Sequence, residues 1–169
     1  VKIKTCNYID DQGRYVTHVN YSTPVGELNK ISQPAGFTSW TLEHEFKTPE
    51  DYKALLFIIK DAVVTENYQA VYKDLEELGD DFVIRDNLPL EPLQNLISHY
   101  MGVETFCLEW MENRDEILKL YDAFVELARK IYPVAANGPL EFANYGGNVI
   151  PSVIGPDGFK NYYVPNYEE

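Results

Sequence analysis

Alternating apolar and polar positions open the chain and predict a β-hairpin over residues 1–22. A period of two is the period of a strand, and the turn between the two runs ends at Gly13, which adopts positive φ without strain. Residues 24–26 contain Pro and Gly and turn the chain again. Residues 37–46 predict a further strand. We therefore expect residues 1–46 to form an antiparallel β segment.

From residue 47 the pattern changes to apolar positions three and four residues apart, which predicts amphipathic helices. The clearest start is at Thr48, an N-cap residue, followed by Pro49 at the first helical position. The longest helix begins near Asn113 and repeats apolar residues as far as Ile131. Further helices are expected at about 67–78, 91–100 and 102–113.

Short apolar runs lie between these helices and predict strands. Residues 80–86 have an apolar centre that indicates a buried strand, residues 138–144 predict another, and a helix is expected to start over 156–163. Strands that alternate with amphipathic helices favour parallel β/α units. A closed (β/α)8 barrel takes roughly 250 residues, so three or four units make only part of one. We expect an α/β fold in which residues 47–169 form one continuous fragment of an incomplete TIM-like barrel.

Charge is the strongest compositional signal. Fourteen basic residues stand against 27 acidic ones, giving a formal net charge of −13. An acidic surface repels phosphate backbones and anionic lipid, which disfavours nucleic-acid and membrane binding. The sequence has no apolar run of the roughly 18 residues that a membrane-spanning helix needs, and no signal-peptide pattern. We therefore expect a cytoplasmic protein.

The chain starts at Val1, directly in the strand pattern, so we expect a processed or excised piece of a longer protein. Its two cysteines, Cys6 and Cys107, lie far apart and do not indicate a disulfide framework. We expect both to be free, buried thiols in a reducing compartment. Cys107 lies between Phe106 and Leu108, and an apolar setting suppresses the reactive thiolate form.

No set of metal ligands is visible in the sequence. His18, His44 and His99 are each isolated from any other His or Cys at helical spacing. Zinc requires three or four converging N, S or O ligands. His44 lies between two glutamates on a predicted strand, and we interpret this stretch as a solvated strand face. We expect no metal site in this chain.

Gly146, Gly147 and Asn148 follow a predicted strand, but they lack the spacing of a phosphate-binding loop and do not open directly into a helix. Two interpretations stay open. Asn148 lines a cleft at the carboxyl end of a barrel strand, or it merely tolerates left-handed backbone beside the glycines.

Tyrosines number 13, and Tyr162, Tyr163 and Tyr167 cluster near the end of the sequence. Such rings either stack on a planar ligand or pack together with their hydroxyls bonded. The catalytic residues stay unknown, because the acidic residues are numerous and most fall on exposed helix faces.

Four segments together resemble the uroporphyrinogen decarboxylase superfamily, which contains haem-pathway decarboxylases and zinc- and corrinoid-dependent methyltransferases. They are residues 23–28, 47–55, 101–124 and 146–167. The last is the most specific, because after the glycines it continues with Gly155-Pro156, Phe159, Tyr162 or Tyr163, Pro165 and Tyr167. The resemblance implies a (β/α)8 barrel with its cleft at the carboxyl ends of the strands.

Within that family pattern, the substrate-binding candidates are Asn148, Tyr145 and Asn144, with Asn148 the first of them. The chain resembles only the middle of the family's barrel. The arginine-containing element by which the decarboxylases hold substrate carboxylates is absent, and so is the half that carries the methyltransferases' zinc ligands. Met111 stands where the decarboxylases place a substrate-contacting tyrosine.

The departure at Met111 disfavours a decarboxylase, and the early hairpin with residues 23–28 looks more like family members found near corrinoid methyl-transfer systems. The resemblance therefore favours a methyltransferase that acts with a corrinoid system as the parent, and we expect the isolated chain to lack a complete site and to be inactive. The alternatives are a uroporphyrinogen decarboxylase of porphyrin biosynthesis, and a non-catalytic accessory or folding fragment. We expect no cofactor in this chain itself, because zinc and corrinoid would belong to a full-length methyltransferase. The expected partners are a corrinoid protein, the remainder of the barrel, or a second copy of the chain.

Overall fold

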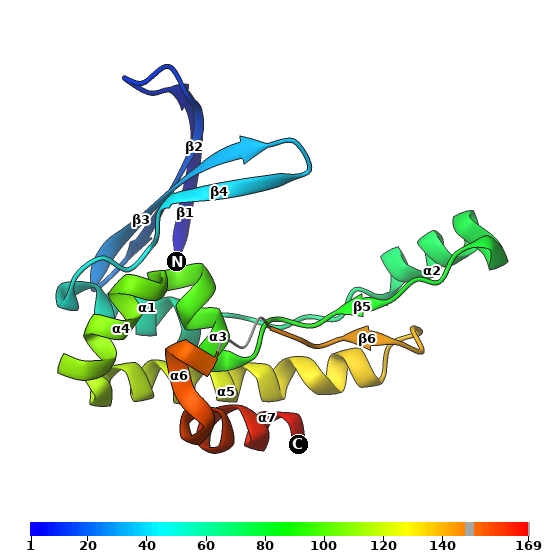
Figure 1. Ribbon diagram of the computed structural model, residues 1–169. Coiled ribbons are helices and arrows are strands. Elements are labelled where there is room, and N and C mark those ends of the chain that lie inside the picture. Colours follow the sequence, from blue (N-terminus) through cyan, green and yellow to red (C-terminus); the bar gives the residue numbers. More distant parts are fainter. Residues whose placement is uncertain (148–150, 169) are drawn as a thin grey trace. The chain divides into compact units, whose positions relative to one another are not determined.

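The computed structural model describes residues 1–147 and 151–168, with mixed helix and strand (Figure 1). The chain divides into two compact units, each built from two stretches of sequence. The first unit comprises Val1–Asp61 and Leu96–Ala123, and the second comprises Ala62–Asn95 and Phe124–Glu169. This division differs from the expected segments 1–46 and 47–169, because helices after residue 46 group with the amino-terminal sheet.

A four-stranded antiparallel sheet forms the first part of unit 1. Its strands follow chain order: β1 (Lys2–Ile9), β2 (Tyr15–Thr23), β3 (Gly26–Ala35) and β4 (Thr38–Glu43). The predicted hairpin and its turn are confirmed, with Gly13 at a φ of 77°. The predicted turn at Pro24 and Gly26 is confirmed, but the strand β3 that follows it was not predicted.

Helices complete unit 1. They are the 3-10 turn η1 (Pro49–Asp51), α1 (Tyr52–Lys60), the π-helix η3 (Leu96–Met101), α4 (Val103–Glu112) and the first part of α5 (Arg114–Ala136). The predicted start at Thr48 is confirmed, and the Asp51 carboxylate accepts the backbone N–H groups of Lys47 and Thr48. The core is formed by apolar side chains that include Leu28, Leu55, Phe106, Ile117 and Leu120.

Unit 2 contains α2 (Tyr68–Leu78), η2 (Gly79–Asp81), β5 (Asp86–Asn87), α3 (Pro92–Asn95), the second part of α5, β6 (Ala143–Asn144), α6 (Pro151–Gly158), η4 (Phe159–Tyr163) and α7 (Val164–Glu168). β5 and β6 pair in parallel, as expected for β/α units. Both strands are much shorter than predicted. Phe82 and Val83 lie outside β5 and are 63% and 81% exposed, so the apolar centre of residues 80–86 is not a buried strand.

The end of unit 2 follows the predicted pattern. Helix α6 is interrupted at Gly155, whose φ of 67° breaks the helix, and Pro156 begins the next helical turn. No closed barrel is formed by the residues that the structure describes, whose only parallel pairing is that of β5 with β6. The described residues thus establish mixed α and β structure with an antiparallel sheet.

Several expectations about isolated side chains are wrong in part. Cys6 and Cys107 are free thiols, as expected, but they are not buried: Cys6 is exposed, like every residue of β1, and Cys107 is half-buried on α4. The stretch around His44 is a solvated face only in part: Glu43 is exposed at the end of β4, whereas Glu45 is buried, and its Oε1 lies 3.2 Å from Lys30 Nζ.

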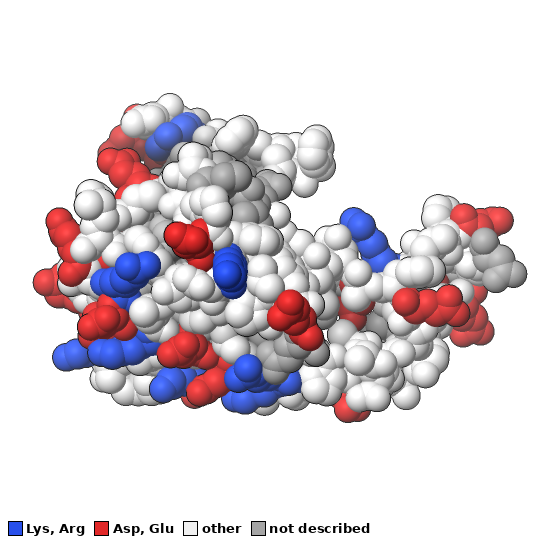
Figure 2. All heavy atoms as spheres, turned by 60° about the horizontal axis from the view of Figure 1, so that its bottom comes forward, with Lys and Arg blue, Asp and Glu red and all other residues white. Residues whose placement is uncertain are grey.

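Charged side chains are unevenly distributed in the face drawn in Figure 2, where acidic groups gather over α2 at the right-hand end. The sequence of α2 includes Asp74, Glu76 and Glu77 against one basic residue, Lys73. Among the helices of residues 1–147 and 151–168, none is both long and apolar enough to cross a membrane. The same residues contain no group of three or more His, Cys, Asp or Glu that could hold a metal ion.

Candidate functional site

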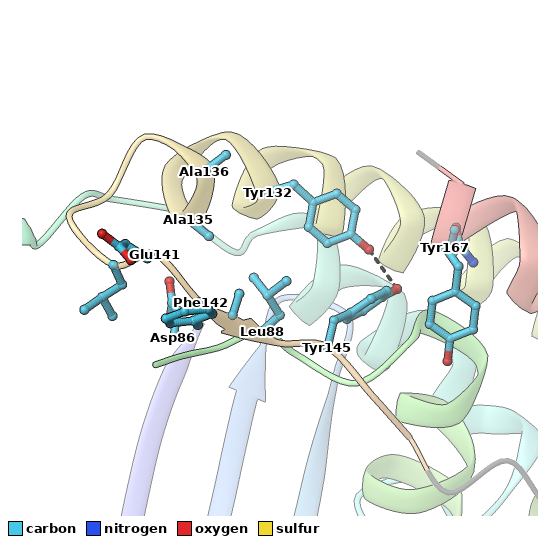
Figure 3. Close-up of a pocket in the computed structure, with 12 residues that line it drawn as sticks. Asp86, Leu88, Tyr132, Ala135, Ala136, Glu141, Phe142, Tyr145 and Tyr167 are labelled. Carbon is cyan, nitrogen blue, oxygen red and sulfur yellow. Dashed lines mark hydrogen bonds between the residues drawn. The ribbon is translucent and has the colours of Figure 1, made fainter. Parts of the chain in front are cut away.

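Unit 2 contains a cavity of about 420 Å³ between the β5–β6 pair and the last turns of α5 (Figure 3). Its walls combine three kinds of side chain. Leu88, Ala135, Ala136, Leu140, Phe142 and Ala143 are apolar, Tyr132, Tyr145 and Tyr167 are aromatic, and Asp86, Glu141 and Asn166 are acidic or polar. A volume of this size suits a small organic ligand.

Alternate residues reach the cavity over residues 86–88 and 143–145, whereas residues 140–143 line it consecutively. Asp86 and Leu88 are two residues apart and both line it, and the same holds for Ala143 and Tyr145. The residues between them, Asn87 and Asn144, belong to the opposite face of the strand pair. There the Asn144 side-chain amide donates to Asn87 Oδ1 at 3.3 Å.

Three tyrosines from different elements meet at one end of the cavity. Tyr132 comes from α5, Tyr145 directly follows β6, and Tyr167 belongs to α7. The Tyr132 hydroxyl donates to the Tyr145 hydroxyl oxygen at 2.9 Å (Figure 3). Burial, followed by the bond from Tyr132, raises the pKa of Tyr145 well above its ordinary value. The phenol is therefore neutral at physiological pH and serves as a polar wall rather than as a base.

Glu91 is a fully buried carboxyl group at the start of α3. Its Oε2 accepts the backbone N–H of Gln94 at 3.0 Å, and its Oε1 accepts the side-chain amide of Asn166 at 2.8 Å. Burial raises the pKa of Glu91 to about 7, although both hydrogen bonds act in the opposite direction. The carboxyl does not line the cavity, so we assign it an anchoring role between α3 and α7 rather than contact with a ligand.

Tyr163 and Gly147 also pack against the start of α3, at Gln94. Tyr163 is fully buried, and its hydroxyl donates to Gln94 Oε1 at 3.2 Å. Gly147 approaches the same side chain so closely that a Cβ there would lie 2.8 Å from Gln94 Cγ. A glycine is therefore required at position 147 because Gln94 leaves no room for a side chain. This packing explains Gly147 without a phosphate-binding role.

The predicted substrate-binding residues are distributed differently. Tyr145 lines the cavity, Asn144 belongs to the opposite face of the strand pair, and Asn148 lies outside the described residues. Among the clustered tyrosines, Tyr163 packs in the interior against Phe159, with ring centroids 5.6 Å apart, whereas Tyr167 lines the cavity.

Sequence reasoning missed most of the lining residues, including Tyr132, Asp86, Glu141 and Asn166, and also the buried pair Glu91 and Gln94 behind the cavity wall. One signal was available for Glu91, because an acidic residue directly before a proline at a helix start suits an N-terminal capping position. No local pattern indicates that Asn166, far along the chain, supplies the second hydrogen bond. Comparison of the chain with protein-family models, curated proteins and solved structures finds no match to any of them.

Proposed function

We propose that this chain is a uroporphyrinogen decarboxylase-like domain of the methyltransferase type, which acts in the cytoplasm with a corrinoid system. In this proposal β5 and β6 are neighbouring strands of a (β/α)8 barrel, and the chain supplies only part of the site. Two features support it. The segment 146–167 resembles the family at its most specific motif, and β5 pairs with β6 in parallel with helices between them.

The observation that favours a methyltransferase over a decarboxylase is the charge of the cavity wall. Asp86 and Glu141 are the ionisable acids among the described lining residues, and no Lys, Arg or His is among them. A substrate with several carboxylates needs cationic partners, as bidentate arginine provides. Such a substrate would be repelled here, whereas a neutral or cationic methyl donor would not.

Zinc does not fit the described residues, because they offer no group of three metal-ligating side chains. We therefore derive no step through a metal for this chain. Its own residues supply an apolar wall, neutral tyrosine hydroxyls and two carboxylates, which can bind and orient a small molecule. The proposed partners are a corrinoid protein or the remainder of the barrel, and the formal net charge of −13 disfavours nucleic acid.

The decisive experiment is to sequence the DNA on both sides of this segment in the source genome. We expect the reading frame to continue downstream into His and Cys residues that form a zinc site. An upstream arginine-containing element without those ligands would favour the decarboxylase instead. Stop codons close on both sides would favour the non-catalytic fragment.

A binding measurement complements the genomic one. We expect uroporphyrin, a stable polycarboxylate related to the decarboxylase substrate, to cause no saturable quenching of protein fluorescence. Saturable binding that is lost in Tyr145→Leu would place a porphyrin against this wall and contradict the methyltransferase proposal.

A further inference from the structure

The three tyrosines of the cavity form a corner of nearly perpendicular rings. The ring centroids of Tyr132 and Tyr145 lie 5.7 Å apart with an interplanar angle of 74°, and those of Tyr145 and Tyr167 lie 5.2 Å apart at 70°. The three side chains lie together at one end of the site in Figure 3. Aromatic rings at right angles to one another around a cavity present both faces and edges toward a bound ligand.

The electrostatic character of this corner favours positive charge. The face of an aromatic ring is its negative region, and a tyrosine face attracts cations within roughly 6 Å. Asp86 on β5 and Glu141 just before β6 add two carboxylates to the lining of the same cavity, at the end away from the tyrosines in Figure 3. No basic side chain among the described lining residues offsets them.

The remaining walls restrict which cation can enter. Leu88, Ala135, Ala136 and Leu140 are apolar and cannot replace the water shell of a small inorganic ion. A cation surrounded by methyl groups loses little hydration on entering such a cavity. It also gains dispersion contacts with the apolar side chains and attraction to the rings.

We infer that the tyrosine corner of this cavity is a binding site for an organic cation, in particular for a methylated ammonium group. The inference rests on the proposed function in one respect: the methylated ammonium compound would be the methyl donor of the proposed methyltransferase. The binding itself follows from the rings, the carboxylates and the apolar walls.

The test compares choline with 3,3-dimethylbutan-1-ol, which has the same shape without the charge. Both are titrated into the full chain by isothermal calorimetry, with potassium chloride as an inorganic control. We expect choline to bind at least about tenfold more tightly than the neutral alcohol, because ring faces and carboxylates distinguish charge rather than shape. Potassium should give no saturable signal.

Two variants locate the site. Tyr167 is partly exposed on α7, so Tyr167→Leu should fold normally while weakening choline binding about fivefold or more. Tyr145→Leu removes the central ring of the corner and should weaken choline binding about fivefold or more as well. The matched control is Tyr72→Leu on α2, which is exposed and outside the cavity, and which should leave binding unchanged. Circular dichroism establishes that each variant is folded.

Each other outcome overturns the inference. Equal affinity for choline and the alcohol would indicate a purely apolar cavity. Binding of neither would indicate that the cavity is a packing surface for another part of a complete barrel. The flanking DNA tests the proposed function separately from choline binding. Choline binding together with decarboxylase-type flanks would retain the cation site and reject the methyl transfer. Absence of choline binding together with methyltransferase-type flanks would reject only the cation site.

Discussion

Burial determines the chemistry of Glu91. The side chain has no exposed surface, and its hydrogen-bond partners come from α3 and from α7. An ionised carboxylate in such a place has lost its hydration, and the donors of Leu93, Gln94 and Asn166 compensate for only part of that loss. The raised pKa of about 7 follows from this imbalance. Protonation of one residue is thereby coupled to the folding of unit 2.

We predict that Glu91 makes the stability of unit 2 depend on pH. The folded carboxyl keeps its proton up to about pH 7, whereas the unfolded one releases it near its ordinary value of 4.5. Between these values the folded state holds the extra proton, so the free energy of unfolding falls as pH rises, by an amount on the order of 3 kcal/mol. Urea unfolding at about pH 5 and about pH 8 measures this fall.

The variant Glu91→Gln should remove the contribution of Glu91 to the pH dependence of the free energy of unfolding. The amide has only one acceptor oxygen, so it also loses one of the hydrogen bonds that Glu91 accepts. The matched control is Glu76→Gln, which replaces an exposed carboxylate on α2 and should leave the pH dependence of stability unchanged. If Glu91→Gln retained the full pH dependence of the parent chain, the assignment of the proton to Glu91 would be wrong.

Gly147 provides a second prediction at the scale of one residue. Gly147→Ala should destabilise unit 2 by about 1–3 kcal/mol, because the new methyl group would meet the buried stem of Gln94 at 2.8 Å. Gly146→Ala is the control, since a Cβ there meets nothing within 4 Å, and its effect should be neutral or slightly stabilising. Thermal unfolding of the two variants measures the difference, and similar losses for both would contradict this packing role.

At the scale of elements, a buried hydrogen-bonded pair joins α1 to α4 in unit 1. The Tyr52 hydroxyl donates to Glu109 Oε2 at 2.7 Å, and the Asn113 amide donates to the same oxygen at 2.8 Å. The pKa of Tyr52 is raised, first by burial and then by this bond to Glu109. The phenol therefore stays a donor throughout the physiological range.

We predict that Tyr52→Phe lowers the free energy of unfolding by about 1–3 kcal/mol, because a buried carboxylate loses one of its donors. Chemical denaturation monitored by circular dichroism measures the loss. The control is Tyr72→Phe on exposed α2, which should change stability by less than about 0.5 kcal/mol. Equal effects of the two substitutions would mean that the Tyr52–Glu109 bond adds nothing to the packing of α1 on α4.

Elements differed in how well the sequence predicted them. The starts at Thr48 and before Arg114 were predicted well, because capping residues and the 3–4 residue period are local signals. The strand at 80–86 was misplaced, because an apolar run indicates burial only when other parts of the chain cover it. Phe82 and Val83 are not covered among the described residues.

At the scale of the whole molecule, the unpaired edges of the sheets favour association. β1 and β4 are the two edges of the antiparallel sheet, and Ile3, Ile9 and Trp40 are exposed large apolar residues on them. Exposed edges with apolar side chains pair readily with other strands. The net charge of −13 opposes contact between copies, and salt screens that repulsion.

We therefore predict that the chain self-associates, and more strongly at about 0.5 M than at about 0.05 M sodium chloride. Multi-angle light scattering at both concentrations measures the mass. The double variant Ile3→Lys/Ile9→Lys should shift the population toward monomer, because charged edge residues block strand pairing. A monomer at both salt concentrations would contradict the prediction.

The sequence by itself determined the local features of this protein. These are the first hairpin, the helix starts, the break at Gly155-Pro156 and the acidic charge, which all depend on residues close together in the chain. Only the tertiary structure decided that Glu91 is buried against Asn166, that Gly147 meets Gln94, and that three tyrosines from distant elements line one cavity. These contacts join residues many positions apart in the chain, and no periodic pattern predicts which distant side chain will cover a given residue.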